Sequence, residues 1–220
     1  MKIISFLGQK GGVGKTNNAH ATAHGLSMLG IPAAYVLTDK RELLNDDRRV
    51  YTIIDGRTVP QLERAIATAR QNANSGVLVI DGGGNRGVVD ELLASVSSMV
   101  ILPFTADDDS VYVVNEEMAQ FPEAWAMPSN WTTNSKAEIV DRGYIEKLEA
   151  NHPGRLLPCT YSTHAIHDFL LANFNGIVLP SAQRYCRVLA RQVAQLLDAE
   201  RVGEASRLKE QRAGKGGSHT

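Results

Sequence analysis

The chain has 220 residues, of which 43% are hydrophobic and 21% charged, and its formal net charge is −1. This near-neutral charge excludes a polycation that coats nucleic acid and an acidic disordered chain, and the length suits one domain with its own core. Two cysteines, Cys159 and Cys186, are too few for a disulfide scaffold or a four-cysteine zinc site.

Short apolar runs alternate with longer stretches of helical periodicity. The expected strands are 2–7, 33–37, 77–80 and 99–102, with weaker candidates at 156–159 and 177–179, and the expected helices are 16–29, 59–73 and 88–97. Continuous apolar strands alternating with helices predict an α/β fold, a mostly parallel twisted sheet covered by helices on both faces. We expect a single domain over 1–202 and a polar, disordered tail over 203–220.

The segment 121–134 holds both tryptophans and two prolines and is expected to be an irregular excursion. A strand that begins at residue 2 leaves no room for a signal peptide, and no apolar run approaches the ~20 residues of a membrane span. The sequence therefore predicts a cytoplasmic protein without a membrane-spanning helix.

The strongest motif is the glycine-rich segment Gly8–Thr16, with the sequence GQKGGVGKT, between an expected strand and an expected helix. Glycines let successive backbone N–H groups point at phosphate oxygens, and the helix that follows adds its positive dipole end. Lys15 would supply a charge to the β- and γ-phosphates, and the Thr16 hydroxyl would bind Mg²⁺. The general pattern G-x-x-x-x-G-K-[ST] fails at Gln9, whereas the variant K-G-G-x-G-K-[ST] matches, with Lys10 as its extra lysine.

This segment resembles the deviant Walker A motif of the ParA/MinD family of P-loop ATPases. The resemblance continues at 36–39 (VLTD), at 79–84 (VIDGGG), which is similar to a Walker B motif with a glycine-rich switch, and at 101–105 (ILPFT). It covers 1–105 well and the rest of the chain weakly. It implies a P-loop NTPase fold, ATP and Mg²⁺ as ligands, and a homodimer that ATP holds together.

The resemblance also implies residue roles. Lys10 would reach the nucleotide of the partner subunit, Asp39 would position the attacking water, and Asp81 would hold Mg²⁺. The nucleotide-binding residues are then Lys10, Gly11, Gly12, Val13, Gly14, Lys15, Thr16 and Asn17; the catalytic ones are Lys10, Lys15 and Asp39; the metal-binding ones are Thr16, Asp39 and Asp81; and the switch is Gly82, Gly83 and Gly84. The chain departs from the family at Asn17, where a second threonine is usual, and at Leu37, where an aspartate is usual.

The last third of the chain carries local positive charge, with eight Lys and Arg residues against four acidic ones between 184 and 215. Arg184, Arg187 and Arg191 are spaced to share one face of a helix. Such a stripe either binds DNA phosphates without sequence preference or is simply a solvated basic face. Binding of this kind would associate the protein with the nucleoid.

The function predicted from these features is a ParA-like ATPase switch that positions or partitions DNA or another cargo, with slow hydrolysis stimulated by a partner protein. One alternative is a MinD-like membrane regulator, although Val202 and Leu208 are the only bulky apolar residues from Arg201 onward. Others are a weakly hydrolysing nucleotide module of a conjugation or secretion system, and a metabolic enzyme. The histidines His20 and His24 are at a helical spacing that can bind a metal, but without an evident third ligand they are interpreted as surface or packing residues, and so are His164 and His167. Asp107–Asp109 are interpreted as a helix cap, with a contact to the nucleotide or the dimer partner as the alternative.

Overall fold

The computed structural model describes residues 1–40, 48–72, 76–83, 87–161, 165–167 and 174–215. Its centre is one six-stranded sheet in the order β3-β2-β4-β1-β5-β6, and every neighbouring pair of strands is parallel. The strands are β1 (Lys2–Phe6), β2 (Ala33–Leu37), β3 (Thr52–Asp55), β4 (Val77–Asp81), β5 (Met99–Phe104) and β6 (Trp125–Pro128). The predicted α/β class with a parallel sheet is thus confirmed.

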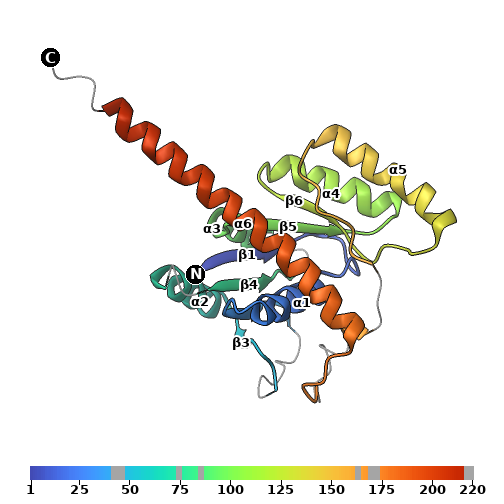
Figure 1. The fold of residues 1–220 in the computed structure, drawn as a ribbon, viewed down its shortest axis with the longest axis horizontal. Coiled ribbons are helices and arrows are strands. Elements are labelled where there is room, and N and C mark those ends of the chain that lie inside the picture. Colours follow the sequence, from blue (N-terminus) through green and yellow to red (C-terminus); the bar gives the residue numbers. More distant parts are fainter. Residues whose placement is uncertain (41–47, 73–75, 84–86, 162–164, 168–173, 216–220) are drawn as a thin grey trace.

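Helices cover both faces of this sheet (Figure 1). The helices are α1 (Lys15–Met28), α2 (Val59–Gln71), α3 (Gly87–Val96), α4 (Asp108–Gln120), α5 (Ser135–Asn151) and α6 (Pro180–Lys215). One hydrophobic core lies between the sheet and α1 and α6, and the other lies beneath α2, α3, α4 and α5. The strands are apolar on both sides because each side faces a layer of helices.

Helix α1 is buried nearly all round, since every residue from Asn18 to Leu26 is buried between the sheet and α6. His20 and His24 both lie in this layer, 1% and 6% exposed, which supports their interpretation as packing residues. Burial, together with the Arg49 charge, lowers the pKa of His24 to about 4, so this imidazole is neutral at pH 7.

Two strands lie where the sequence predicts none. The segment 121–134 contains β6, so the prediction of a purely irregular excursion is wrong there. β6 is an edge strand, where Pro128 is tolerated because it removes no central hydrogen bond. The other new strand, β3, is the opposite edge; the β-branched residues Thr52, Ile53 and Ile54 are a local signal for it, but the strand has only four residues and none of them is fully buried. The weak candidate at 156–159 forms only an isolated bridge between Leu156 and Ala126, and 177–179 forms no strand.

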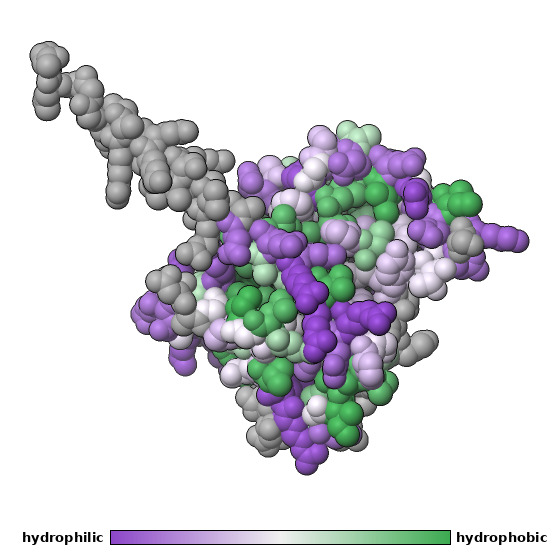
Figure 2. Space-filling view, viewed as in Figure 1, coloured by the Kyte–Doolittle hydropathy of each residue, from purple (hydrophilic) through white to green (hydrophobic). Residues whose placement is uncertain are grey.

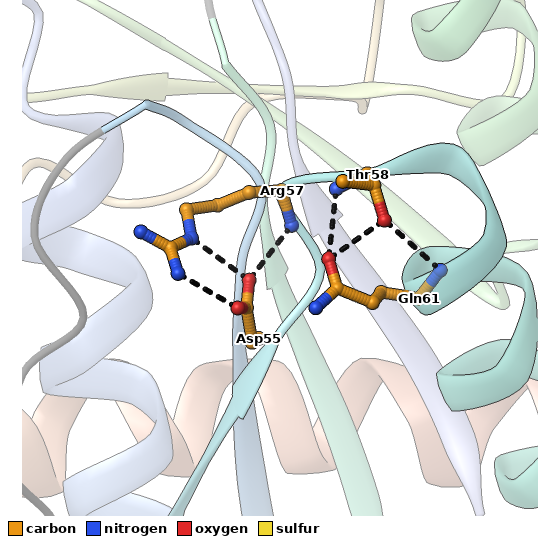
Figure 3. Close-up of polar contacts among 4 residues, drawn as sticks. All are labelled: Asp55, Arg57, Thr58 and Gln61. Atoms are coloured by element: carbon orange, nitrogen blue, oxygen red, sulfur yellow. Dashed lines mark hydrogen bonds and ion pairs between the residues drawn. The ribbon is translucent and has the colours of Figure 1, made fainter.

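The turn from β3 into α2 shows how local chemistry sets an element boundary (Figure 3). Arg57 pairs with Asp55 through two guanidinium nitrogens at 2.9 and 2.8 Å, and these hydrogen bonds hold the pKa of Asp55 down at about 2. Thr58 then caps α2 by accepting from the Gln61 N–H, while the Gln61 side chain accepts from the Thr58 N–H. This reciprocal capping box starts the helix at residue 59.

Helix α6 continues past the body of the fold to Lys215 (Figure 1). The polar composition predicts the end of ordered structure near residue 203, yet the helix includes 203–215. Helix-forming Ala, Glu, Lys, Arg and Leu dominate that stretch, and its isolated glycines cost only about 1 kcal/mol each. Within the described residues, none of the helices has both the length and the apolar character that crossing a membrane requires.

Candidate functional site

The glycine-rich segment joins β1 to α1 and curls at the carboxyl edge of the sheet. Gly12 and Gly14 have φ values of 79° and 89°, a left-handed conformation that other residues adopt at a cost. Gly14 is the N-cap of α1, and a Cβ there would lie 2.8 Å from the Ser129 hydroxyl. Gly14 has no side chain to cap the first turn of α1, so no N-cap side chain occupies the backbone N–H groups there. Since the first residues of α1 line the adjoining cavity, these N–H groups and the positive end of the helix dipole are available to an anion in it.

A cavity of about 370 Å³ opens above this segment. Its lining is made of Gly11, Gly12, Val13, Gly14, Lys15, Thr16, Asn17, Asp39, Asp81, Gly82 and His167. Residues from three separate parts of the predicted site therefore meet in one hollow, of the size that small-molecule sites have. Among these lining residues is His167, which the sequence does not assign to the nucleotide site; its Nδ1 lies 3.4 Å from the Asn17 amide nitrogen.

Two lysines at this cavity have different surroundings. The Lys15 ammonium donates to the carbonyl of Lys10 at 2.7 Å, so it lies across the mouth of the glycine-rich curl. Lys10 itself is not among the described residues that line the cavity, and its ammonium lies 3.5 Å from the Asp109 carboxylate on α4. This pair is exposed, and such pairs contribute at most about 1 kcal/mol, so Lys10 is readily released.

Oxygen donors for a metal come from two neighbouring strands and the first helix. Asp81 ends β4, beside Leu37 of β2, and Asp39 follows β2 by two residues. Asp39, Asp81 and Thr16 all line the cavity. Mg²⁺ is usually bound by one or two carboxylates, waters and substrate phosphates, and this donor set fits that chemistry.

Thr38, between these elements, ties the two strand ends together. Its buried hydroxyl donates to the Asp81 carbonyl at 2.6 Å and accepts from the Gly83 N–H at 2.9 Å. Gly82 must be glycine, because a Cβ there would lie 2.7 Å from the Phe6 carbonyl oxygen. The predicted switch residues Gly82 and Gly83 are therefore anchored to β1 and to the segment that carries Asp39. Gly84 lies outside the described residues.

Replacing Thr38 with valine should lower the free energy of unfolding by about 1–3 kcal/mol, because it leaves a buried Gly83 N–H without its acceptor. Urea denaturation followed by circular dichroism measures this change. Thr38→Ser is the matched control, since it retains the hydroxyl and removes only a methyl group. Equal stability of the valine and serine variants would contradict this role of the hydroxyl.

Glu117 is a buried carboxylate at the start of the glycine-rich segment that sequence reasoning missed. It projects from α4, is 6% exposed and accepts from the Gln9 N–H at 2.7 Å. Burial raises its pKa, while the Gln9 hydrogen bond and the Lys15 charge oppose that shift. Glu117 thereby fixes the start of the curl, and only a contact between residues 108 positions apart reveals it.

On the same helix, Asp107 is the N-cap of α4 and accepts from the Ser110 N–H, which agrees with the interpretation as a helix cap.

The predicted basic stripe lies on the first part of α6. Arg184, Arg187 and Arg191 are all exposed. Hydrophilic side chains follow the path of α6 across this face of the molecule (Figure 2). The first part of this helix is joined to α1, because the Tyr185 hydroxyl donates to the Asn18 side chain. The stripe therefore lies on a helix packed against α1, the helix that begins at the glycine-rich segment.

No family model matches the chain, and no curated protein matches it significantly in sequence. Solved structures do match. The cell-division protein MinD of Aquifex aeolicus has a TM-score of 0.68 and 14% identity over 89% of this chain and 97% of its own. A plasmid partition protein of Borrelia burgdorferi B31 bound to AMPPNP has a TM-score of 0.65 and 15% identity over 88% and 98%. MinD of Pyrococcus horikoshii complexed with Mg-ADP has a TM-score of 0.62 and 13% identity over 89% and 96%.

These similarities place the chain in a structural class. Its fold is that of the MinD and ParA P-loop ATPases, as the resemblance of its motifs implies. Identities of 13–15% establish the fold alone, and the similarity spans nearly the whole of each solved chain.

Proposed function

We propose that this protein is an ATP-dependent switch of the ParA type, which binds Mg-ATP in the cavity above the glycine-rich segment and dimerises over it. The observation that carries the proposal is the meeting of Lys15, Thr16, Asp39 and Asp81 in one cavity at the end of α1. A cationic lysine, a helix N-terminus and two carboxylates are the groups that a metal-bound triphosphate requires.

The roles of the residues follow from their positions. The amides of Gly11–Gly14 and the Lys15 ammonium would hold phosphate oxygens, and Thr16 with Asp81 would hold the metal. When bound, Mg²⁺ would neutralise charge on the β- and γ-phosphates. Asp39 follows β2 by two residues and lines the cavity, where its carboxylate would orient a water toward the γ-phosphate. Gly82 and Gly83 would sense the γ-phosphate, since they are anchored to both strands that flank the metal donors.

Dimerisation is proposed because Lys10 is not among the described residues that line its own cavity. Its ammonium pairs instead with the exposed carboxylate of Asp109. In a dimer, the Lys10 ammonium would reach the nucleotide of the second copy. There it would stabilise charge on the transferred phosphoryl group, as an arginine finger does. Slow hydrolysis, stimulated by a partner protein, and the positioning of DNA or another cargo complete the proposed cycle. The solved MinD and plasmid partition proteins support it by their shared fold.

Size-exclusion chromatography with light scattering tests the proposal. With ADP and Mg²⁺ we expect a monomer of 23.9 kDa, and with a non-hydrolysable ATP analogue and Mg²⁺ twice that mass. A chain that binds the analogue and stays monomeric would contradict the dimer switch. A chain that binds neither nucleotide would contradict the ATPase itself. Flotation with anionic vesicles distinguishes the membrane-regulator alternative.

A triple alanine substitution at Arg184, Arg187 and Arg191 tests whether the stripe binds DNA. We expect binding of random duplex DNA by the analogue-bound protein to weaken. The slope of log affinity against log salt should fall by about 0.9 for each DNA phosphate that the variant no longer neutralises. Alanine at Arg64, Arg70 and Arg142, which are exposed on α2 and α5, removes the same charge from the other side of the sheet. Equal effects of the two triple variants would contradict the stripe as the binding surface.

A further inference from the structure

A tyrosine in the middle of the sheet is hydrogen-bonded to the proposed metal carboxylate. Tyr35 of β2 is 1% exposed, and its hydroxyl donates to Oδ2 of Asp81 at 2.8 Å. Asp81 is 2% exposed and lies at the carboxyl end of the neighbouring strand β4. A phenol in an apolar sheet is costly unless its hydroxyl is bonded, and here its partner is a residue that lines the candidate nucleotide cavity.

The ring of Tyr35 is itself held in place. His20 of α1 stacks on it, with ring centroids 3.8 Å apart and planes 20° from parallel. The Nδ1 of His20 is in turn hydrogen-bonded to the Tyr51 hydroxyl at 2.7 Å, and Tyr51 accepts from Arg49 at 3.0 Å. Burial raises the pKa of Tyr51 to about 12, so this phenol keeps its proton. The tyrosine that contacts Asp81 is therefore fixed by a chain of aromatic and polar contacts.

We propose that Tyr35 is a positioning residue for Asp81, and that its hydroxyl sets the orientation in which the carboxylate faces the metal. The inference rests on the proposed function, since the metal accompanies the nucleotide. A carboxylate whose Oδ2 accepts a phenol O–H cannot rotate about its Cβ–Cγ bond without losing that bond. The direction of Oδ1 follows from the position of the Tyr35 ring. Partners behind a metal ligand typically change metal affinity 10- to 100-fold when they are removed.

A purely structural role for Tyr35 would not need the hydrogen bond to the carboxylate. Phenylalanine would fill the same space between β2 and α1, stack on His20 and pack against the same apolar neighbours. Thr38, on the same strand end, binds the backbone carbonyl of Asp81 and holds the strand whether or not the carboxylate is oriented. Tyr35→Phe thus removes the hydrogen bond to the carboxylate and keeps the packing of the ring.

The test compares nucleotide affinity with and without metal. The dissociation constant of a fluorescent, non-hydrolysable ATP analogue is measured in excess Mg²⁺ and in EDTA, and the ratio of the two constants reports the metal coupling. We expect Tyr35→Phe to reduce that ratio about tenfold and to leave the affinity in EDTA unchanged. Tyr185→Phe is the matched control, because it removes a phenol hydroxyl that donates to Asn18 in the same core and contacts neither Tyr35 nor Asp81; its ratio should equal that of the wild type. Asp81→Ala gives the ratio without the carboxylate.

The proposal is overturned if Tyr35→Phe has the same ratio of dissociation constants as the wild type while Mg²⁺ no longer changes the affinity of Asp81→Ala. If Tyr35→Phe fails to fold, 3-fluorotyrosine at position 35 keeps the hydroxyl, and its ¹⁹F resonance should shift when Mg²⁺ joins the nucleotide complex. An unmoved resonance would overturn the proposal equally. If the wild type does not bind the analogue, the proposed function fails. The positioning role of Tyr35 is then tested by comparing the orientation of the Asp81 carboxylate in crystal structures of the wild type and of Tyr35→Phe. The same orientation in both structures would refute that role.

Discussion

Replacing Gly25 with alanine should lower the free energy of unfolding by about 3 kcal/mol, because the added methyl group would overlap the backbone of α6. Helices α1 and α6 approach closely at Gly25, since a Cβ there would lie 2.1 Å from the carbonyl oxygen of Cys186 and 2.6 Å from its carbonyl carbon. Backbone atoms of a packed helix cannot move aside as a flexible side chain can, so α6 must shift bodily. Urea denaturation monitored by circular dichroism measures the loss.

Gly143→Ala is the matched control for this substitution. Gly143 lies in the exposed part of α5, and a Cβ there would meet nothing within 4 Å. Alanine should therefore stabilise the protein by about 0.5–1 kcal/mol through helix propensity alone. If Gly25→Ala were as stable as the wild type, the close α1–α6 contact would not exist in solution.

Alanine substitutions at the two loop lysines should separate nucleotide binding from hydrolysis. Lys15→Ala should weaken ATP binding about 10- to 100-fold, because it removes a charge-assisted contact inside the cavity. Lys10→Ala should leave binding to the monomer nearly unchanged, because Lys10 is not among the described residues of the cavity lining, yet reduce the rate of hydrolysis about 1,000-fold. Isothermal titration calorimetry and a phosphate-release assay measure the two effects.

Mixing two inactive variants tests whether Lys10 acts across the dimer. Lys10→Ala retains Asp39, and Asp39→Ala retains Lys10, so a mixed dimer contains one complete site, in which the lysine comes from the other chain. We expect phosphate release to reappear on mixing, although each variant alone is inactive. The double variant Lys10→Ala/Asp39→Ala, mixed with either single variant in the same ratio, forms no complete site and controls for total protein. No recovery on mixing would show that Lys10 acts within its own chain or not at all.

The parts of the fold that are predictable from the sequence are those whose signal is local. The central strand β2 coincides with the expected 33–37, because a strand buried on both faces must be apolar throughout. The helix after the loop is predictable to within one residue at each end, because Gly14 and Gly30 bound it. The edge strands β3 and β6 are harder to predict, because β3 is only four residues long and partly exposed, and β6 contains a proline that argues against a central strand.

The same distinction applies to the site. The glycine-rich segment, Asp39 and Asp81 stand at recognisable spacings in the chain, and the structure brings them to one cavity. Tyr35 and Glu117 carry no motif: their partners, Asp81 and Gln9, are 46 and 108 residues away, so only the strand pairing and helix packing show the contacts. The helical spacing of the α1 histidines places both on one face and is compatible with a surface or a packing role, but nothing in the sequence pairs His20 with the two tyrosines that it contacts.

The contact between α1 and α6 joins the first helix of the chain to the last described one. At about 5–20 residues per second, roughly 10–30 s of synthesis separate Gly25 from the Cys186 carbonyl that it packs against. Throughout that interval the apolar layer of α1 has no cover from α6. Helix α1 therefore reaches its packed form only after α6 has been synthesised, and the nascent chain is exposed to chaperones and to aggregation until then.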